Sequence, residues 1–135
     1  MIDVRTAPYA ALLLRVSLGV MFIAHSLLKI LVFTLAGAAG FFESIGLPGV
    51  LAYPVAIGEL AGGVMLILGF YARWVALALV PVLLGAAYFA HGSAGWLFSN
   101  QGGGWEYPVF LAFAAVSLGL LGNGALAVRL PAAKG

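Results

Sequence analysis

Few side chains in this sequence could do chemistry, and the most informative of them lie inside long apolar stretches. Arg15, His25 and Lys29 fall within the apolar residues 8–32, where helical geometry places them on one face of about 120°. Glu59 falls near the middle of the apolar residues 50–70. Ionisable groups in such stretches are costly and normally face the interior of a helical bundle. The candidate sites are therefore interior ones.

An unpaired carboxylate in an apolar interior is very unfavourable, so Glu59 should have a cationic partner on the first apolar stretch. Counting depth at about 1.5 Å per helical residue places Arg15 closer to Glu59 than Lys29 is. We therefore expect a buried Arg15–Glu59 ion pair. Such a pair either holds two helices in register or forms a proton or substrate site, and registry is the better attested use.

A second group of polar and aromatic residues is expected near the C-terminal end of the first apolar stretch, away from Arg15. They could surround a quinone headgroup, with imidazole and ammonium groups bonding its carbonyls. Two of them, His25 and His91, could instead ligate a haem iron, and interfacial anchoring explains the same residues without any ligand. No catalytic residue can be named, and no other metal site is predicted. The members of this candidate pocket are His25, Lys29, Tyr88, His91, Trp105 and Glu106.

Composition excludes several classes of function. Charged residues make up 7% of the 135 residues and hydrophobic residues 64%, which is too little polar surface for a water-soluble globule. Lipid is therefore the expected solvent of the exterior. The chain contains no cysteine, so thiol catalysis and thiolate metal sites are excluded. No basic cluster is present, so nucleic acid is not an expected partner.

The pattern of apolar stretches predicts an all-α integral membrane four-helix bundle in a single domain, residues 1–135. A short interfacial helix should follow the first transmembrane helix, where apolar residues recur at helical spacing in residues 34–49. The first stretch is too long for a signal peptide and is expected to be a retained helix. A flexible loop should span residues 91–106. The four transmembrane helices are expected at about residues 8–32, 50–70, 74–90 and 107–121.

The distribution of basic residues predicts the orientation. Arg5, Arg73, Arg129 and Lys134 all fall at the two termini or in the short turn between the second and third helices. The other two connections contain no Lys or Arg outside the helices. By the positive-inside rule, both termini should be cytoplasmic.

Seven short motifs in order along the chain resemble the DoxX family of bacterial inner-membrane proteins. The resemblance implies a four-helix bundle in the inner (plasma) membrane and a link to redox metabolism, since the family takes its name from a membrane subunit of a thiosulfate:quinone oxidoreductase. Other members are thought to tether redox enzymes to the membrane. The motifs are LRVSLG (14–19), AHSLLK (24–29), FFESIGLP (41–48), GELAGG (58–63), GFYAR (69–73), GWEYP (104–108) and LGNG (121–124).

Matched by position, Arg15, His25, Lys29, Glu59 and Arg73 occupy the recurring polar positions of the family. The usual His-Gly pair is His25-Ser26 here. The resemblance implies a quinone-associated or redox-complex membrane subunit with redox-enzyme partners, at most one subunit of an oxidoreductase. Alternatives are a non-catalytic scaffold for partner proteins and a small transporter component, the latter a homo-oligomer with a path lined by the Arg15–Glu59 pair.

Overall fold

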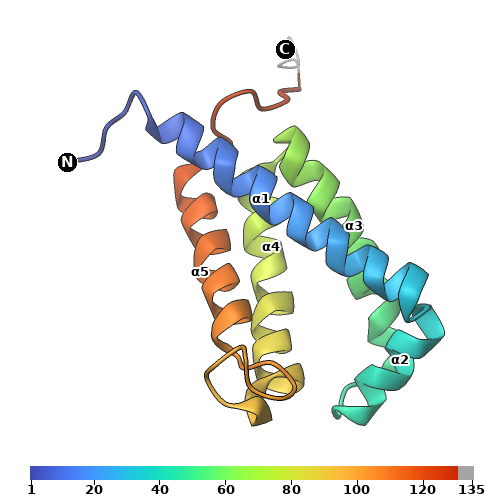
Figure 1. Ribbon diagram of the computed structural model, residues 1–135. Helices are drawn as coiled ribbons and strands as arrows, with labels where there is room; N and C mark the ends of the chain where they lie inside the picture. Colours follow the sequence, from blue (N-terminus) through green and yellow to red (C-terminus); the bar gives the residue numbers. More distant parts are fainter. Residues whose placement is uncertain (131–135) are drawn as a thin grey trace.

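The computed structural model describes residues 1–130, and all regular structure in that range is helical (Figure 1). Two helices end in π-helical turns, at Leu28–Val32 and Ala86–Ala90, and short 3₁₀ turns occupy Gly49–Leu51 and Gly92–Ala94. The α-helices are α1 (Ala7–Leu27), α2 (Leu35–Ser44), α3 (Ala52–Leu68), α4 (Ala72–Gly85) and α5 (Glu106–Leu121).

Three of the helical stretches are long and apolar enough to cross a membrane: Ala7–Val32, Gly49–Leu68 and Ala72–Ala90. The fourth apolar helix, α5, has 16 residues and is about 24 Å long, against a hydrocarbon core of about 30 Å. The predicted all-α membrane fold is confirmed, and each helix begins and ends within two residues of its predicted bounds. That α5 also spans the bilayer stays a prediction.

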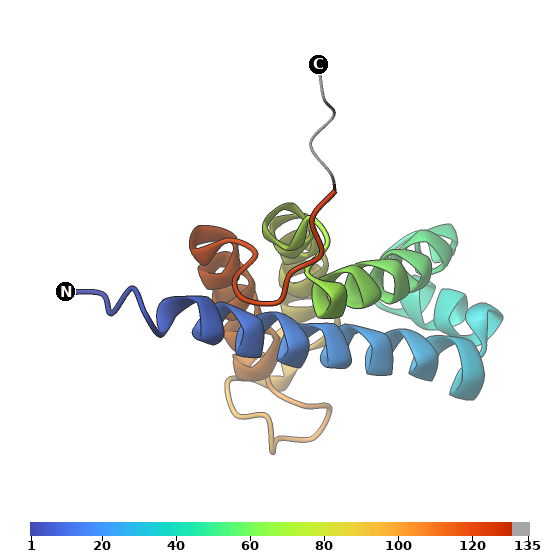
Figure 2. The same ribbon diagram turned by 90° about the horizontal axis from the view of Figure 1, so that it is seen from above.

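The helices are arranged with α1 lying diagonally across the other long helices (Figure 1). Viewed from above, α5, α4 and α3 stand in a row behind it (Figure 2). The closest packing is of α1 on α3 and of α4 on α5, while α1 also contacts α5 and α3 contacts α4. The predicted short helix after the first span is α2, which folds back against α3.

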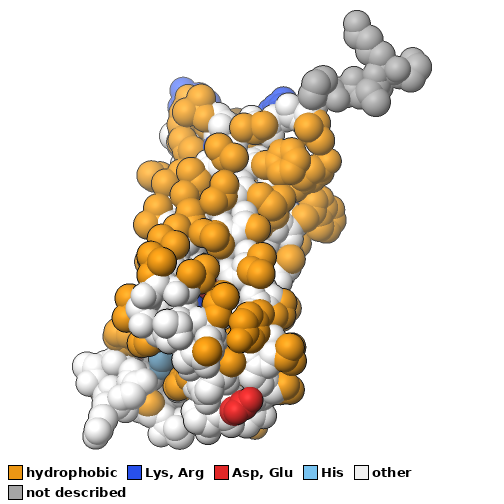
Figure 3. Space-filling model, turned by 90° about the vertical axis from the view of Figure 1, so that its right-hand side faces the viewer, with side chains coloured by type: hydrophobic (Ala, Val, Ile, Leu, Met, Phe, Trp, Pro, Cys, Tyr) orange, Lys and Arg blue, Asp and Glu red, His pale blue; other side chains and the backbone are white. Residues whose placement is uncertain are grey.

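The interior is built largely from alanine and leucine. Small alanines let the helix backbones approach closely, as is usual where lipid provides no hydrophobic drive for helix association. The face shown in Figure 3 is largely covered with hydrophobic side chains between the two ends of the molecule. The central cluster comprises Ala11, Leu18, Phe22, Leu66, Ala72, Ala76, Leu79, Leu83, Ala112, Ala115 and Leu118.

The N-terminus and residues 122–130 lie at the same end of the molecule as the turn between α3 and α4 (Figure 1). After α5, residues 122–130 form a strap that returns across this end. Ala125 N donates to Pro8 O over 2.9 Å, and Val128 N donates to Leu68 O over 3.0 Å. The strap therefore ties the start of α1 to the end of α3. Lys134, which was part of the orientation argument, lies outside the described residues.

Candidate functional site

The ion pair inside the bundle joins Lys29 to Glu59. Lys29 Nζ donates to Glu59 Oε2 over 2.7 Å, and the two side chains are 19% and 6% exposed. Lys29 stands on the π-helical turn that ends the first span, and Glu59 stands in the middle of α3. A π-turn inserts one extra residue into a helix and often marks a functional position. Both charged groups are therefore largely shielded from water.

The predicted Arg15–Glu59 pair was wrong, and the direction of side chains explains why. Contacts between Arg15 and Ile67 and between Ser26 and Ala56 set an antiparallel register for α1 and α3. Glu59 is then nearly level with residue 23, about 9 Å from Lys29 and about 12 Å from Arg15 along the axis. Helical side chains lean toward the N-terminus of their helix. Lys29 and Glu59 therefore lean toward each other, whereas Arg15 leans away.

Arg15 is fully buried and binds backbone carbonyls instead. Its Nη1 donates to Ile67 O over 2.6 Å and to Leu66 O over 3.3 Å, and its Nη2 donates to Ala125 O on the strap. A cation at the C-terminus of α3 complements the helix dipole and the unpaired last carbonyls. Arg15 thus joins three segments at the end of the molecule where the termini lie.

The α1–α3 interface that sets this register is a close backbone contact. A Cβ added at Gly19 would lie 2.7 Å from Gly63 O, and a Cβ at Gly63 would lie 2.8 Å from Gly19 O. Further along, Ser26 Oγ donates to Ala56 O over 2.6 Å. This contact fixes how far along α3 each side chain of α1 reaches, and so it selects Lys29 as the partner of Glu59.

His25 lies on the same helix as Lys29 but faces α5. Its Nδ1 is 2.8 Å from Met21 O, so Nδ1 carries the proton and Nε2 keeps its lone pair in the neutral ring. Its ring centroid lies 6.4 Å from that of Tyr107, whose hydroxyl is 3.5 Å from Met21 Sδ. The structure therefore places His25 beside an aromatic residue that the sequence analysis did not single out.

His91 and Glu106 are used by the loop between α4 and α5. His91 Nδ1 is 2.7 Å from Gly103 O, and Glu106 Oε1 accepts from Phe98 N over 3.0 Å. Trp105 N and Glu106 N also donate to carbonyls across the loop. The expected flexible loop is thus closed by its own hydrogen bonds, and two members of the predicted pocket serve to close it.

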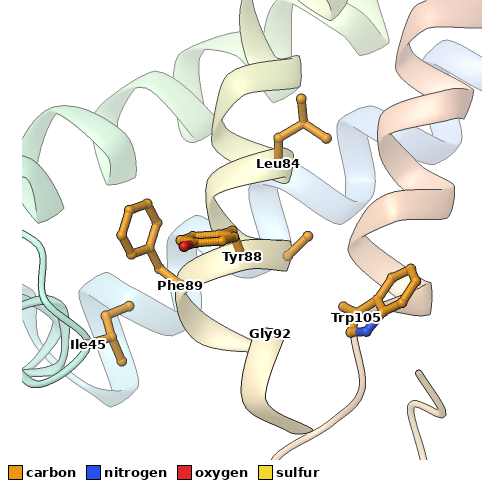
Figure 4. Close-up of a pocket in the computed structure, with 7 residues that line it drawn as sticks. Ile45, Leu84, Tyr88, Phe89, Gly92 and Trp105 are labelled. Carbon is orange, nitrogen blue, oxygen red and sulfur yellow. The ribbon is translucent and has the colours of Figure 1, made fainter. Parts of the chain in front are cut away.

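Tyr88 and Trp105, the remaining members, line a groove of about 700 Å³ at the end of the molecule away from the termini (Figure 4). Its walls come from the end of α2, the last turns of the third span and the residue that precedes α5. Sequence reasoning missed Ile45 and Phe89, which enter only through the packing of these elements. The lining is Ile45, Leu84, Ala87, Tyr88, Phe89, Gly92 and Trp105.

This groove has two hydrogen-bond donors beside its apolar side chains, and Tyr88, which carries one of them, is 76% exposed. The Tyr88 hydroxyl and the Trp105 indole N–H have no hydrogen-bond acceptor among residues 1–130. A planar ligand with two acceptor groups is the chemistry that such a lining suits. The six predicted pocket residues do not form one site: Lys29 pairs with Glu59, His25 lies at Tyr107, two close the loop and two line the groove.

Comparison with known proteins agrees with the membrane fold. The family model described as DoxX matches residues 10–92, which is more than half of the chain. A relative in Bacillus subtilis (strain 168), named "Putative oxidoreductase CatD", is 35% identical over 117 residues, covering 87% of this chain and 82% of the relative. No solved structure matches the chain significantly. The resemblance predicted from the motifs is confirmed, and this chain belongs to the DoxX family of membrane proteins.

Proposed function

We propose that this protein is a quinone-binding membrane subunit of an oxidoreductase complex in the bacterial inner membrane. The observation that carries the proposal is the aromatic groove, in which Tyr88 and Trp105 offer two unused donors beside apolar side chains. The relative's name, an oxidoreductase, supports a redox role for the family. The proposal moves the expected quinone contacts from His25, Lys29 and His91 to the groove.

A quinone headgroup is a flat ring with a carbonyl oxygen on each side. In the groove, Phe89 would pack on the face of the quinone ring, and the Tyr88 O–H and the Trp105 N–H, which lies in the plane of the indole, would donate to the carbonyls. The side chains of Leu84 and Ile45 would receive the first part of the isoprenoid tail. A volume of about 700 Å³ lies within the usual range for small-molecule sites of about 300–1,000 Å³.

The redox step assigned to the complex is reduction of quinone to quinol, which consumes two electrons and two protons. In this proposal a partner oxidoreductase supplies the two electrons, and water at the edge of the bilayer supplies the two protons. The contribution of this chain is to hold and orient the headgroup at the edge of the bilayer, where a partner outside the membrane can reach it.

The test uses two of the three tryptophans, which lie at opposite ends of the molecule. Quinones quench nearby indole fluorescence, and Trp105 lines the groove while Trp74 begins α4 at the opposite end. Two single-tryptophan proteins are made, one keeping only Trp105 and the other only Trp74, and each is titrated with a short-chain quinone in micelles. Saturable quenching of Trp105 is expected, with only weak, linear quenching of Trp74.

Two tyrosine variants distinguish binding of the quinone in the groove from its partition into the micelle. Tyr88→Phe removes one donor and should weaken binding about two- to ten-fold, the usual range for one hydrogen bond. Tyr9→Phe, an equally conservative change on an exposed tyrosine of α1, should have no effect. Equal quenching of both tryptophans, or equal affinity of the two tyrosine variants and the parent, would refute the proposal.

A non-catalytic anchor for partner proteins is the second candidate, favoured by the loop between α4 and α5. Its hydrogen bonds hold Trp96, Leu97 and Phe98 in a fixed arrangement, with each side chain at least half exposed. Leu97→Ser should then abolish co-purification with a redox partner without changing Trp105 quenching. The transporter alternative was argued from a path lined by an Arg15–Glu59 pair, and in the structure Glu59 pairs with Lys29 instead.

A further inference from the structure

A second cavity lies at the opposite end of the molecule, where two arginines from separate segments converge. It has a volume of about 480 Å³ and lies between the start of α4 and the strap after α5. Arg73 and Arg129 line it together with Tyr71, Trp74, Gly122 and Asn123. None of these residues lines the groove, so this cavity is a separate site, and its lining is cationic.

The charge of this cavity is not balanced by any described acidic group. Of the four acidic residues in the chain, Glu59 pairs with Lys29, Glu106 accepts from the loop, and Asp3 pairs with Arg5 over 3.7 Å. The fourth, Glu43, lies on α2 beside Gly49. Within residues 1–130, the guanidinium groups of Arg73 and Arg129 form no hydrogen bond or ion pair, so both remain available to an anion.

The backbone around Arg73 is shaped to hold it there. Gly122 has a φ of +93°, a conformation that favours glycine, and a Cβ at this position would lie 3.2 Å from Arg73 Nη2, so the guanidinium packs closely on the strap. Arg73 N donates to Asn123 Oδ1 over 3.3 Å, which fixes the strap against the first turn of α4. The residue before α4, Tyr71, provides no side-chain cap, and Asn123 accepts from only one N–H of the first turn, so the positive end of the helix dipole adds to the same field.

We infer that this cavity binds the phosphate headgroup of an anionic phospholipid. Arginine pairs with phosphate oxygens in a bidentate manner, and a helix start favours the same group. The neighbouring Trp74 is 66% exposed and Leu121 is also exposed, so apolar surface for acyl chains adjoins the cationic end. A lipid satisfies both features, whereas a soluble phosphate would use only the first. Lys and Arg atoms are visible at this end in Figure 3.

Native mass spectrometry of the purified protein tests the assignment. The protein is titrated with phosphatidylglycerol and, separately, with phosphatidylcholine, which has the same phosphate but no net charge. One phosphatidylglycerol per chain should bind preferentially. At about 1 kcal/mol per basic residue, Arg73→Gln and Arg129→Gln should each weaken it roughly five-fold, and the double variant about 25-fold.

The matched control is Arg5→Gln, which removes the same charge from the same end at an exposed residue paired with Asp3. It should leave binding unchanged, and Arg73→Lys should retain most of it. Equal losses in Arg5→Gln and Arg73→Gln would show a diffuse charge effect and overturn the site. Displacement of the lipid by glycerol phosphate at similar concentration would overturn the lipid assignment in favour of a soluble phosphate. Quinone binding, at the other end, is unaffected by either result.

Discussion

The Lys29–Glu59 pair allows a sharp test of the packing between α1 and α3. Removing one member of a buried ion pair leaves the other charge without a partner, which typically costs about 3–5 kcal/mol of folding free energy. Glu59 is the more buried member, at 6% exposure, so Lys29→Met should cost an amount in this range. Lys29 is 19% exposed and has a long flexible stem, so Glu59→Gln should cost less, about 1–3 kcal/mol.

The double variant Lys29→Met/Glu59→Gln carries neither charge and should be within about 1 kcal/mol of the parent, since neutral replacements of buried pairs are often harmless. The coupling energy between the two positions should therefore be about 4–8 kcal/mol, the sum of the two single costs less the small cost of the double variant. The free energy of unfolding is measured for the four proteins by titration with SDS in mixed micelles, followed by circular dichroism.

A parallel cycle with Arg15→Met and Glu59→Gln is the control. These residues share no contact in the structure, so their effects should add to within about 0.5 kcal/mol. Arg15→Met should itself be destabilising, because three carbonyls lose their donor. A larger coupling of Glu59 to Arg15 than to Lys29 would refute the register derived above.

Two further predictions concern the contacts that set the geometry. Gly63→Ala should destabilise the protein by about 1–3 kcal/mol, because the new methyl group meets the backbone of Gly19, whereas Gly58→Ala, with nothing within 4 Å of its Cβ, should be neutral or slightly stabilising in the same SDS titration. Arg15→Gln should release the strap at Ala125, so limited proteolysis should remove the C-terminal residues faster than from the parent, with Arg5→Gln as the unaffected control.

The helices were predictable from the sequence because each is a long, largely apolar run, and α3 and α5 end directly before Gly69 and Gly122. The buried face of α3 was also predictable, since Glu59, Gly62 and Gly63 recur at helical spacing, and all three are buried. The cationic partner was not, because depth counted along the sequence favours Arg15, whereas the register of α1 on α3 places Lys29 slightly closer to Glu59. Side-chain direction in an antiparallel pair decides between them.

The rest of the candidate site depends on contacts that carry no sequence pattern. His91 and Glu106 bind backbone groups of their own loop, and the backbone path of a loop with five glycines between residues 92 and 104 does not follow from spacing. The groove needs Ile45 of the connection after α2 beside Phe89 of the third span. These two residues come together only through the packing of separate helices, which the sequence pattern does not reveal.

Arg15 also has a consequence for the order of assembly during synthesis. It enters the membrane with the first helix, but its acceptors are made much later, at Leu66, Ile67 and Ala125. A guanidinium in hydrocarbon without acceptors is costly, so α1 on its own should remain loosely inserted until α3 arrives. All of its hydrogen bonds form only once the strap, which follows α5 in the chain, has been made. A chain interrupted before residue 125 would therefore present an incompletely neutralised arginine, a feature by which quality-control proteases could distinguish unfinished copies from complete ones.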